Sequence, residues 1–133
     1  MPLLPITAFY GALLGFLMLY LAFGVVKSRQ RHKSGLGHQH NDILVAGRIH
    51  ANAAEYIPIV LILIALAELN GAPNGLLHIF GAAFLFARVI HAWGFKVSQG
   101  ATHIGRYWGT VITFLSLILL GLLNLYLCWP YLF

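Results

Sequence analysis

Three polar side chains share one face of a predicted helix in a part of the chain that is otherwise apolar. Arg48, Asn52 and Glu55 are spaced i, i+4 and i+7, which aligns them along one side of an α-helix. The same helix runs on into IVLILIALAEL, residues 59–69. Because an ionised side chain at the centre of a bilayer costs at least ~2.5–3.5 kcal/mol, such residues in a membrane segment indicate a binding or catalytic site.

Further polar residues lie in the two later apolar segments. Arg88 and His91 are spaced i and i+3, and Arg106 opens the last apolar segment. Counting helical turns from the connecting loops places these residues at a comparable depth near one membrane surface. We expect the following side chains to converge there on one polar chamber: Arg48, Asn52, Glu55, Arg88, His91 and Arg106.

The predicted chamber carries an excess of positive charge. Glu55 is expected to form an ion pair with Arg88, since each charge is costly to bury alone, and Arg48 and Arg106 then remain unpaired. An arginine fork matches a carboxylate in particular, so this excess predicts an anionic ligand. The competing interpretation is a purely structural bridge between helices, which requires no such excess of charge.

Pro58 follows the polar face of this helix directly. Proline removes one backbone hydrogen bond from a helix and tends to kink it. Two interpretations remain open: a kink that opens the chamber, and an ordinary kink without chemical consequence.

The composition assigns the chain to the integral membrane proteins. Of its 133 residues, 60% are hydrophobic and only 8% are charged, whereas a soluble domain carries about 25% charged residues. The net charge of +5 comes from lysines and arginines near the ends of apolar segments. This placement indicates membrane orientation, so we expect no nucleic-acid partner.

Four apolar segments are each long enough to cross a hydrocarbon core of about 30 Å as a helix. They are residues 6–26, 43–69, 75–95 and 107–127. The predicted fold is therefore an all-α, four-helix transmembrane bundle that forms one domain over residues 1–133. Five glycines are expected to let helices approach closely: Gly81, Gly94, Gly105, Gly109 and Gly121.

The basic residues predict the orientation of the bundle. Lysines and arginines occur in the first loop, residues 27–42, and beside the third loop, but not in the second loop or the tails. The positive-inside rule places both basic loops in the cytoplasm and both termini outside. His38, His40 and Glu68 are expected to be solvated and His78 to lie at the membrane interface, and no metal site is predicted.

The polar segments resemble one family, the membrane-associated proteins in eicosanoid and glutathione metabolism (MAPEG). RIHANAAEYIP, residues 48–58, is similar to the family's second-helix pattern R-x-H-x-N-x-x-E with a following proline. RVIHAWGF, residues 88–95, resembles its R-x-x-H element, and HIGRYWGTV, residues 103–111, resembles the start of its fourth helix. RHKSGLG, residues 31–37, is similar to the first loop of small bacterial members.

The resemblance implies a homotrimer of four-helix subunits in a bacterial inner membrane. It implies glutathione as co-substrate, bound between subunits at the cytoplasmic side, and a lipophilic electrophile or lipid peroxide that arrives from the bilayer. Arg106 takes the family's role of stabilising the thiolate. The glutathione-binding residues implied are Arg48, Asn52, Glu55, Arg88 and His91.

The sequence departs from the family's enzymes at several positions. Ala51 and Ala53 stand where an arginine and an acidic residue are common, and Phe95 stands where several enzymes have a tyrosine. Tyr56 and Tyr107 are the candidates to replace that hydroxyl. The alternative function is a non-catalytic binding or transport protein for an anionic metabolite. Transport requires access from both sides, so the placement of the polar residues near one surface favours the enzyme.

Overall fold

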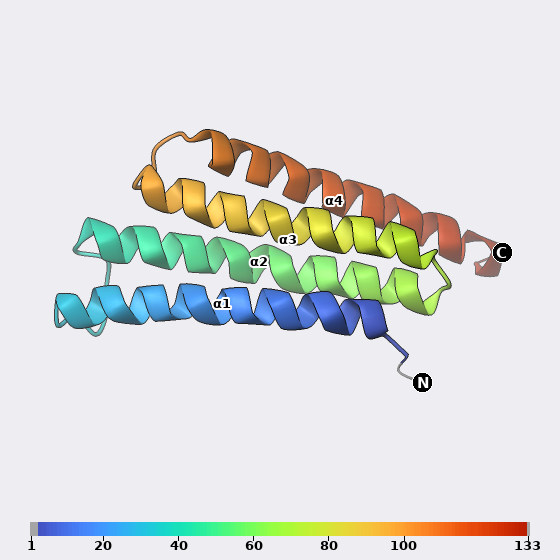
Figure 1. Cartoon of the computed structure of the whole chain (residues 1–133), viewed down its shortest axis with the longest axis horizontal. Helices are drawn as coiled ribbons and strands as arrows, with labels where there is room; N and C mark the ends of the chain where they lie inside the picture. Colours follow the sequence, from blue (N-terminus) through green and yellow to red (C-terminus); the bar gives the residue numbers. More distant parts are fainter. Residues whose placement is uncertain (1–2, 133) are drawn as a thin grey trace.

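The structure, a computed structural model, describes residues 3–132, and this part of the chain is helical without any strand. Four long helices run antiparallel along the molecule (Figure 1). Their bounds, with those of a short 3-10 helix at the end, are α1 Pro5–Arg31, α2 Asn41–Leu69, α3 Asn74–Val97, α4 Ile104–Cys128 and η1 Trp129–Tyr131. The predicted all-α fold with four membrane-length helices is confirmed.

The helices do not all touch one another. Among the described residues α2 contacts each of the other three long helices and α3 packs extensively on α4, whereas α1 and α4 do not meet. The predicted helix limits are close to those observed, except that α1 continues to Arg31 through part of the segment expected to be a loop. The loops at the α1–α2 and α3–α4 connections lie at the same end of the bundle (Figure 1), hereafter the basic end.

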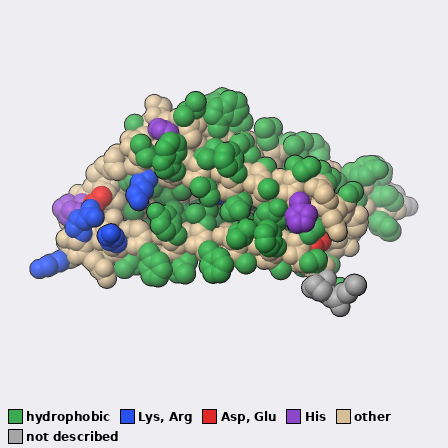
Figure 2. Space-filling model, in the orientation of Figure 1, with side chains coloured by type: hydrophobic (Ala, Val, Ile, Leu, Met, Phe, Trp, Pro, Cys, Tyr) green, Lys and Arg blue, Asp and Glu red, His purple; other side chains and the backbone are tan. Residues whose placement is uncertain are grey.

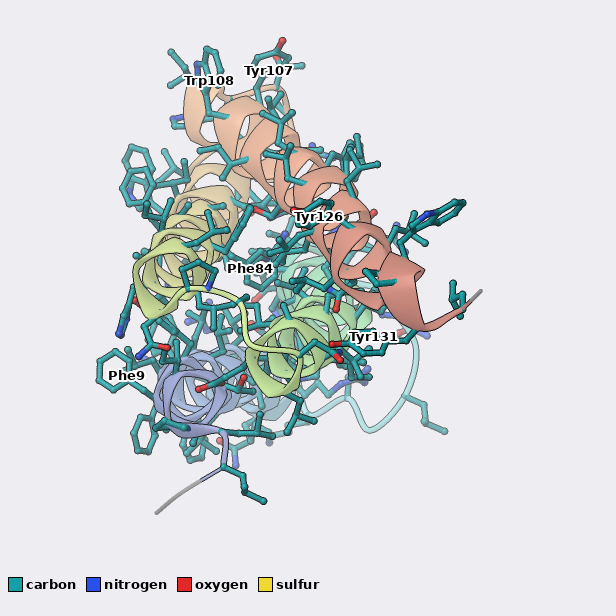
Figure 3. All side chains as sticks on the ribbon, turned by 90° about the vertical axis from the view of Figure 1, so that its right-hand side faces the viewer. Phe9, Phe84, Tyr107, Trp108, Tyr126 and Tyr131 are labelled. Atoms are coloured by element: carbon teal, nitrogen blue, oxygen red, sulfur yellow. The ribbon has the colours of Figure 1, made fainter. Side chains whose placement is uncertain are left out.

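The outside of the bundle is suited to lipid. All four long helices are long and apolar enough to span a membrane, and Figure 2 shows hydrophobic side chains along the body with lysines and arginines gathered at the basic end. Phe9, Tyr107 and Trp108 project away from the helices in Figure 3 and are more than half exposed. The chain is therefore a multi-pass integral membrane protein.

The core follows from one apolar stripe on each helix. Phe84 of α3 lies between the helices (Figure 3) and is fully buried. The other large apolar side chains that are fully buried come from all four helices, namely Leu14, Ile43, Val60, Ile64, Leu77 and Leu120. These contacts fix the rotation of each helix about its own axis, and so decide which polar side chains face inward.

Glycines set the close approach of α3 and α4. A Cβ at Gly109 would lie 2.6 Å from the Cβ of His91 and 2.7 Å from the carbonyl oxygen of Ala87, and one at Gly94 would lie 2.6 Å from the backbone nitrogen of Arg106. Close approach is confirmed at Gly81, Gly94, Gly105 and Gly109. It is wrong at Gly121, where a Cβ would meet no atom within 4 Å.

Glu68, which we expected to be solvated, instead holds the start of α1. Its carboxylate accepts hydrogen bonds from the backbone nitrogens of Ile6 at 2.9 Å and Thr7 at 2.8 Å, and from the Thr7 hydroxyl at 2.7 Å. The first N–H groups of a helix have no partner within it, and its N-terminus favours a negative charge. Glu68 therefore acts as a cap supplied by the neighbouring helix, which its sequence position at the end of α2 did not indicate.

α2 is continuous through Pro58. The proline ring lies on the exposed side of the helix. The helix on either side of it contributes to the same buried core, with Ile57 and Val60 both buried.

Candidate functional site

The centre of the site is a guanidinium that the protein encloses almost completely. Arg88 on α3 is only 2% exposed. Its Nη2 donates to Asn52 Oδ1 on α2 at 2.6 Å and lies 3.3 Å from His91 Nδ1, while Nη1 donates to Thr113 Oγ1 on α4 at 3.3 Å. Three helices thus meet at one charged group near the basic end.

No carboxylate neutralises Arg88 within residues 3–132, where every ion pair involves Asp42. Glu55 is exposed on α2. The predicted ion pair between Glu55 and Arg88 is therefore wrong within the chain. At about 100° per residue, Arg48 and Glu55 lie some 40–60° further round α2 than Asn52. Asn52 stands at the edge of the polar face that is turned toward α3, and Arg48 and Glu55 face outward.

Arg106 lies at the start of α4 and binds the loop before it. Its Nη1 donates to the carbonyl oxygens of Gly100 at 2.6 Å and Ala101 at 3.3 Å. Its guanidinium carbon lies 4.3 Å from the centre of the Phe95 ring, a distance typical of a cation–π contact. Phe95 thus contacts both Arg106 and His91, whose ring centre is 5.9 Å from that of Phe95.

Beside Arg106 the surface is hollowed into an open groove of about 840 Å³. Its lining is Thr102, His103, Ile104, Arg106, Tyr107, Trp108, Thr110, Val111 and Phe114. The polar members come from the end of the α3–α4 loop and from the first turns of α4, and the apolar Trp108, Val111 and Phe114 continue along the helix toward the middle of the bundle. The groove offers a charged end and an apolar body.

The six predicted residues therefore separate into three groups. Asn52, Arg88 and His91 form one hydrogen-bonded cluster. Arg106 adjoins it through the Phe95 ring. Arg48 and Glu55 lie on the exposed face of α2, and no hydrogen bond or ion pair joins them to the cluster in the described part of the chain. A single chain thus has an open polar face backed by a buried cation, rather than a closed chamber.

One contributor to this cluster, Thr113, was missed from the sequence, and Tyr56 was named there without being placed in the cluster. Thr113 is fully buried and accepts from Arg88, and the Tyr56 ring centre lies 5.8 Å from the Arg88 guanidinium carbon. Thr113 follows Arg106 by two helical turns and so lies on the same face of α4, and this spacing was an available signal. Tyr56 was one of two candidates to replace the family tyrosine, whereas Tyr107, the other, is 63% exposed and packs on Trp108.

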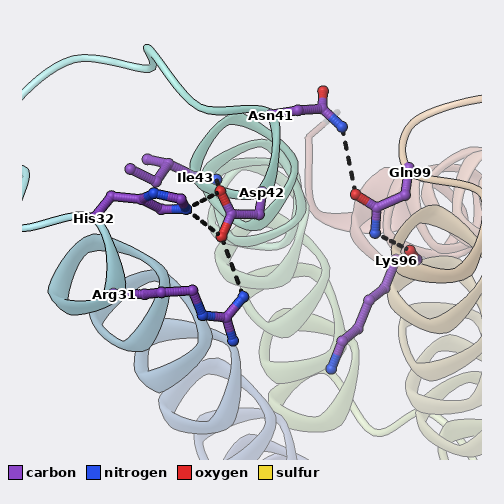
Figure 4. A network of polar contacts seen from close by, with 7 residues as sticks. All are labelled: Arg31, His32, Asn41, Asp42, Ile43, Lys96 and Gln99. Atoms are coloured by element: carbon purple, nitrogen blue, oxygen red, sulfur yellow. Dashed lines mark hydrogen bonds and ion pairs between the residues drawn. The ribbon is translucent and has the colours of Figure 1, made fainter.

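A second polar network ties the loops of the basic end together (Figure 4). Asp42 binds His32 at 2.9 Å and Arg31 at 3.5 Å, and Asn41 donates to Gln99 at 3.4 Å. Across residues 3–132 no group of three or more His, Cys, Asp or Glu side chains is arranged to hold a metal ion. These contacts join α1, α2 and the α3–α4 loop, and so support the end of the bundle where Arg48 and Arg106 lie.

Comparison with known proteins agrees with this arrangement. The model of the MAPEG family matches residues 7–126, which include α2 and α3 and nearly all of α1 and α4. Inner membrane protein YecN of Escherichia coli is 34% identical over 130 residues, which are 96% of this chain and 97% of that protein, in strain K12 and likewise in an O6:H1 strain. The match spans every helix that contributes to the buried cluster, and the chain belongs to the MAPEG family.

Proposed function

We propose that this protein is a glutathione-dependent transferase or peroxidase of the inner membrane. Its second substrate is a lipophilic electrophile or a lipid peroxide, and its active site opens on the cytoplasmic side. The observation that carries the proposal is the uncompensated Arg88 behind the polar face of α2, in a chain of the MAPEG family. A cation without an internal carboxylate favours an anionic ligand.

The polar groups match those of glutathione, which carries carboxylates, an ammonium and a thiol. Arg48, exposed on α2, binds a carboxylate, and Glu55 binds the ammonium. Asn52 and His91 supply hydrogen bonds beside them. Arg106, which contacts the Phe95 ring, stabilises the thiolate by its charge. Because arginine stays protonated, it acts by electrostatics and does not take the thiol proton.

The reaction requires only a positioned thiolate. A free thiol has a pKa near 8.5, and a nearby cation favours the anion, so the proton leaves to cytoplasmic water. The sulfur lone pair then attacks the electrophilic carbon and the leaving group departs with its bonding pair. With a hydroperoxide, sulfur attacks the terminal oxygen and the O–O bond breaks, which gives a glutathione sulfenic acid and an alkoxide that takes a proton from water to become the alcohol. The open groove beside Arg106 provides an apolar approach for either substrate.

The active form is a homotrimer, a number of subunits that follows from the family resemblance; the exposed face of α2 adds only that a neighbouring subunit is needed to cover it. Arg48 and Glu55 are charged and exposed on a helix that spans the membrane, and ionised groups facing lipid are costly. A neighbouring subunit packed against this face removes that cost and closes the site. Native mass measurement in detergent tests the assembly, and a monomer or dimer as the largest species would contradict it.

Glutathione binding to the purified, detergent-solubilised protein tests the function directly. We expect saturable binding, followed by conjugation when an aryl halide is added. Glu55→Gln removes the ammonium partner and is expected to weaken binding about tenfold without lowering the thermal midpoint, because Glu55 has no partner within the described chain. Absence of binding by the parent would refute the proposal. Binding without turnover of electrophile or peroxide would favour the alternative, a binding or transport protein for an anionic metabolite.

A further inference from the structure

Asn52 lies between the buried cation and the open polar face. Its Oδ1 accepts from Arg88 Nη2 at 2.6 Å, the shorter of the two hydrogen bonds that Arg88 makes to other helices. Its side chain is half-buried, next to the exposed Arg48 and Glu55. Within residues 3–132 no hydrogen bond uses Asn52 Nδ2. One end of the carboxamide is thus engaged, and the other end is available.

Arg88 determines which end is available. A guanidinium has only donors, so its partner must be the carboxamide oxygen. Rotating the amide by half a turn would set donor against donor at this short distance and leave the cation without its best acceptor. The orientation of Asn52 is therefore fixed with Oδ1 toward Arg88 and the Nδ2 hydrogens toward the open face.

Thr113 in turn fixes Arg88. The Thr113 hydroxyl donates to the carbonyl oxygen of Gly109 at 2.7 Å, so its lone pairs are free to accept from Arg88 Nη1 at 3.3 Å. The close approach of α4 to α3 at Gly109 brings this hydroxyl within reach. Arg88 Nε has no partner in the described chain. The guanidinium is therefore held in place by the contact of Nη1 with Thr113 and by the contacts of Nη2 with Asn52 and His91.

We infer that Arg88 and Thr113 are positioning residues that make Asn52 an obligatory hydrogen-bond donor. At Asn52 the site therefore selects a hydrogen-bond acceptor of glutathione, either a carboxylate oxygen or a peptide carbonyl oxygen. The inference rests on the proposed function for the identity of the ligand. It reassigns Arg88 from direct contact with the ligand to support of Asn52, since a side chain only 2% exposed is screened from the open face.

Glutathione affinity and thermal midpoint, measured on the full-length protein in detergent, separate positioning from structure. Asn52→Asp keeps an oxygen for Arg88 but replaces the outward donor with a charged acceptor. We expect affinity to fall at least tenfold, about 1.4 kcal/mol, while the midpoint stays the same or rises. Thr113→Val removes the acceptor for Nη1 and is expected to weaken binding about fivefold, and Thr113→Ser should restore it.

Ser116→Ala is the matched control. Ser116 is buried on α4, three residues after Thr113, and its hydroxyl donates to the carbonyl oxygen of Ile112 at 2.8 Å. It makes no hydrogen bond with Arg88 among the described residues, so its removal should leave affinity unchanged. Parent-like affinity in Asn52→Asp would overturn the inference, as would parent-like affinity in a folded Thr113→Val. If Thr113→Val does not fold, the glutathione affinity of Asn52→Asp alone tests the inference. A parent that binds no glutathione would refute the proposed function as well.

Discussion

The guanidinium of Arg106 has a structural and a proposed chemical role. It donates to Gly100 and Ala101 in the α3–α4 loop, and it is the group proposed to stabilise the thiolate. Arg106→Ala is expected to raise the pKa of the bound thiol by about one unit, ~1.4 kcal/mol, and to lower the thermal midpoint by a few degrees. Ultraviolet absorbance of the thiolate, titrated against pH at saturating glutathione, measures the first effect.

Two further variants separate these roles of Arg106. Arg106→Lys keeps the charge but not the paired geometry of its donors, so the thiol pKa should stay near that of the parent while the midpoint falls. Lys33→Gln removes a charge from an exposed loop residue at the same end and should change neither quantity. If the thiolate of Arg106→Ala titrates as in the parent, Arg106 does not stabilise the thiolate and its role is limited to its contacts with the α3–α4 loop.

At the scale of single residues, the sequence indicated which side chains matter but not how they pair. The spacing of Arg48, Asn52 and Glu55 correctly predicted a shared face. It did not show that the face is turned outward, with only Asn52 reaching α3. Pairing depends on the rotation and offset of neighbouring helices, and these come from side-chain packing rather than from the periodicity of one segment. For the same reason, the contact between Arg88 and Thr113 could not be predicted from the sequence.

At the scale of helices, the distance between α3 and α4 depends on Gly109. A Cβ there would contact His91 Cβ at 2.6 Å and the Ala87 carbonyl at 2.7 Å, both on a rigid backbone. Gly109→Ala is therefore expected to lower the thermal midpoint by several degrees, in line with the ~1–3 kcal/mol typical of overpacking. Gly121→Ala on the same helix meets no atom within 4 Å and should be neutral or stabilising through helix propensity. Equal midpoints for the two variants would contradict this account.

The start of α1 depends on α2 through Glu68. Glu68→Ala removes the acceptor of three hydrogen bonds and is expected to cost about 1–2 kcal/mol, the range for loss of a helix cap. Thr7→Val removes only the hydroxyl contact and should cost less. Thermal unfolding in detergent compares the two variants, and hydrogen exchange at the first turn of α1 should rise most in Glu68→Ala. Unchanged exchange there would argue against the cap.

At the scale of the whole molecule, the positions of the basic residues predict its orientation. In a Cys128→Ser background, Asn74→Cys should react with an impermeant maleimide in intact cells whose outer membrane admits the reagent. Ser34→Cys, at the basic end, should react only after the inner membrane is opened. The reason is the positive-inside distribution of lysine and arginine. Labelling of both positions from the same side would refute the topology.

The number, order and approximate limits of the helices were predictable because long apolar segments have one stable form in a bilayer. The composition indicated an integral membrane protein, and the placement of lysines and arginines predicted an orientation in the membrane that can be tested. The extension of α1 to Arg31 was not predictable from hydropathy, because its last turns are polar and are held by the contacts of Arg31 and His32 with Asp42. The Glu68 cap joins residues that are far apart in the chain, so no local sequence pattern could predict it.

The position of Arg88 also bears on how the chain enters the membrane during synthesis. α3 has the lowest mean hydropathy of the four spans, and its arginine finds partners on α2, already made, and on α4, still to come. After α3 is made and before α4 is made, Asn52 is the principal hydrogen-bond acceptor available to the Arg88 guanidinium. α3 therefore enters most readily alongside α2, and the arrival of Thr113 completes the enclosure. We therefore expect Arg88 to couple the insertion of the last three helices into one ordered event.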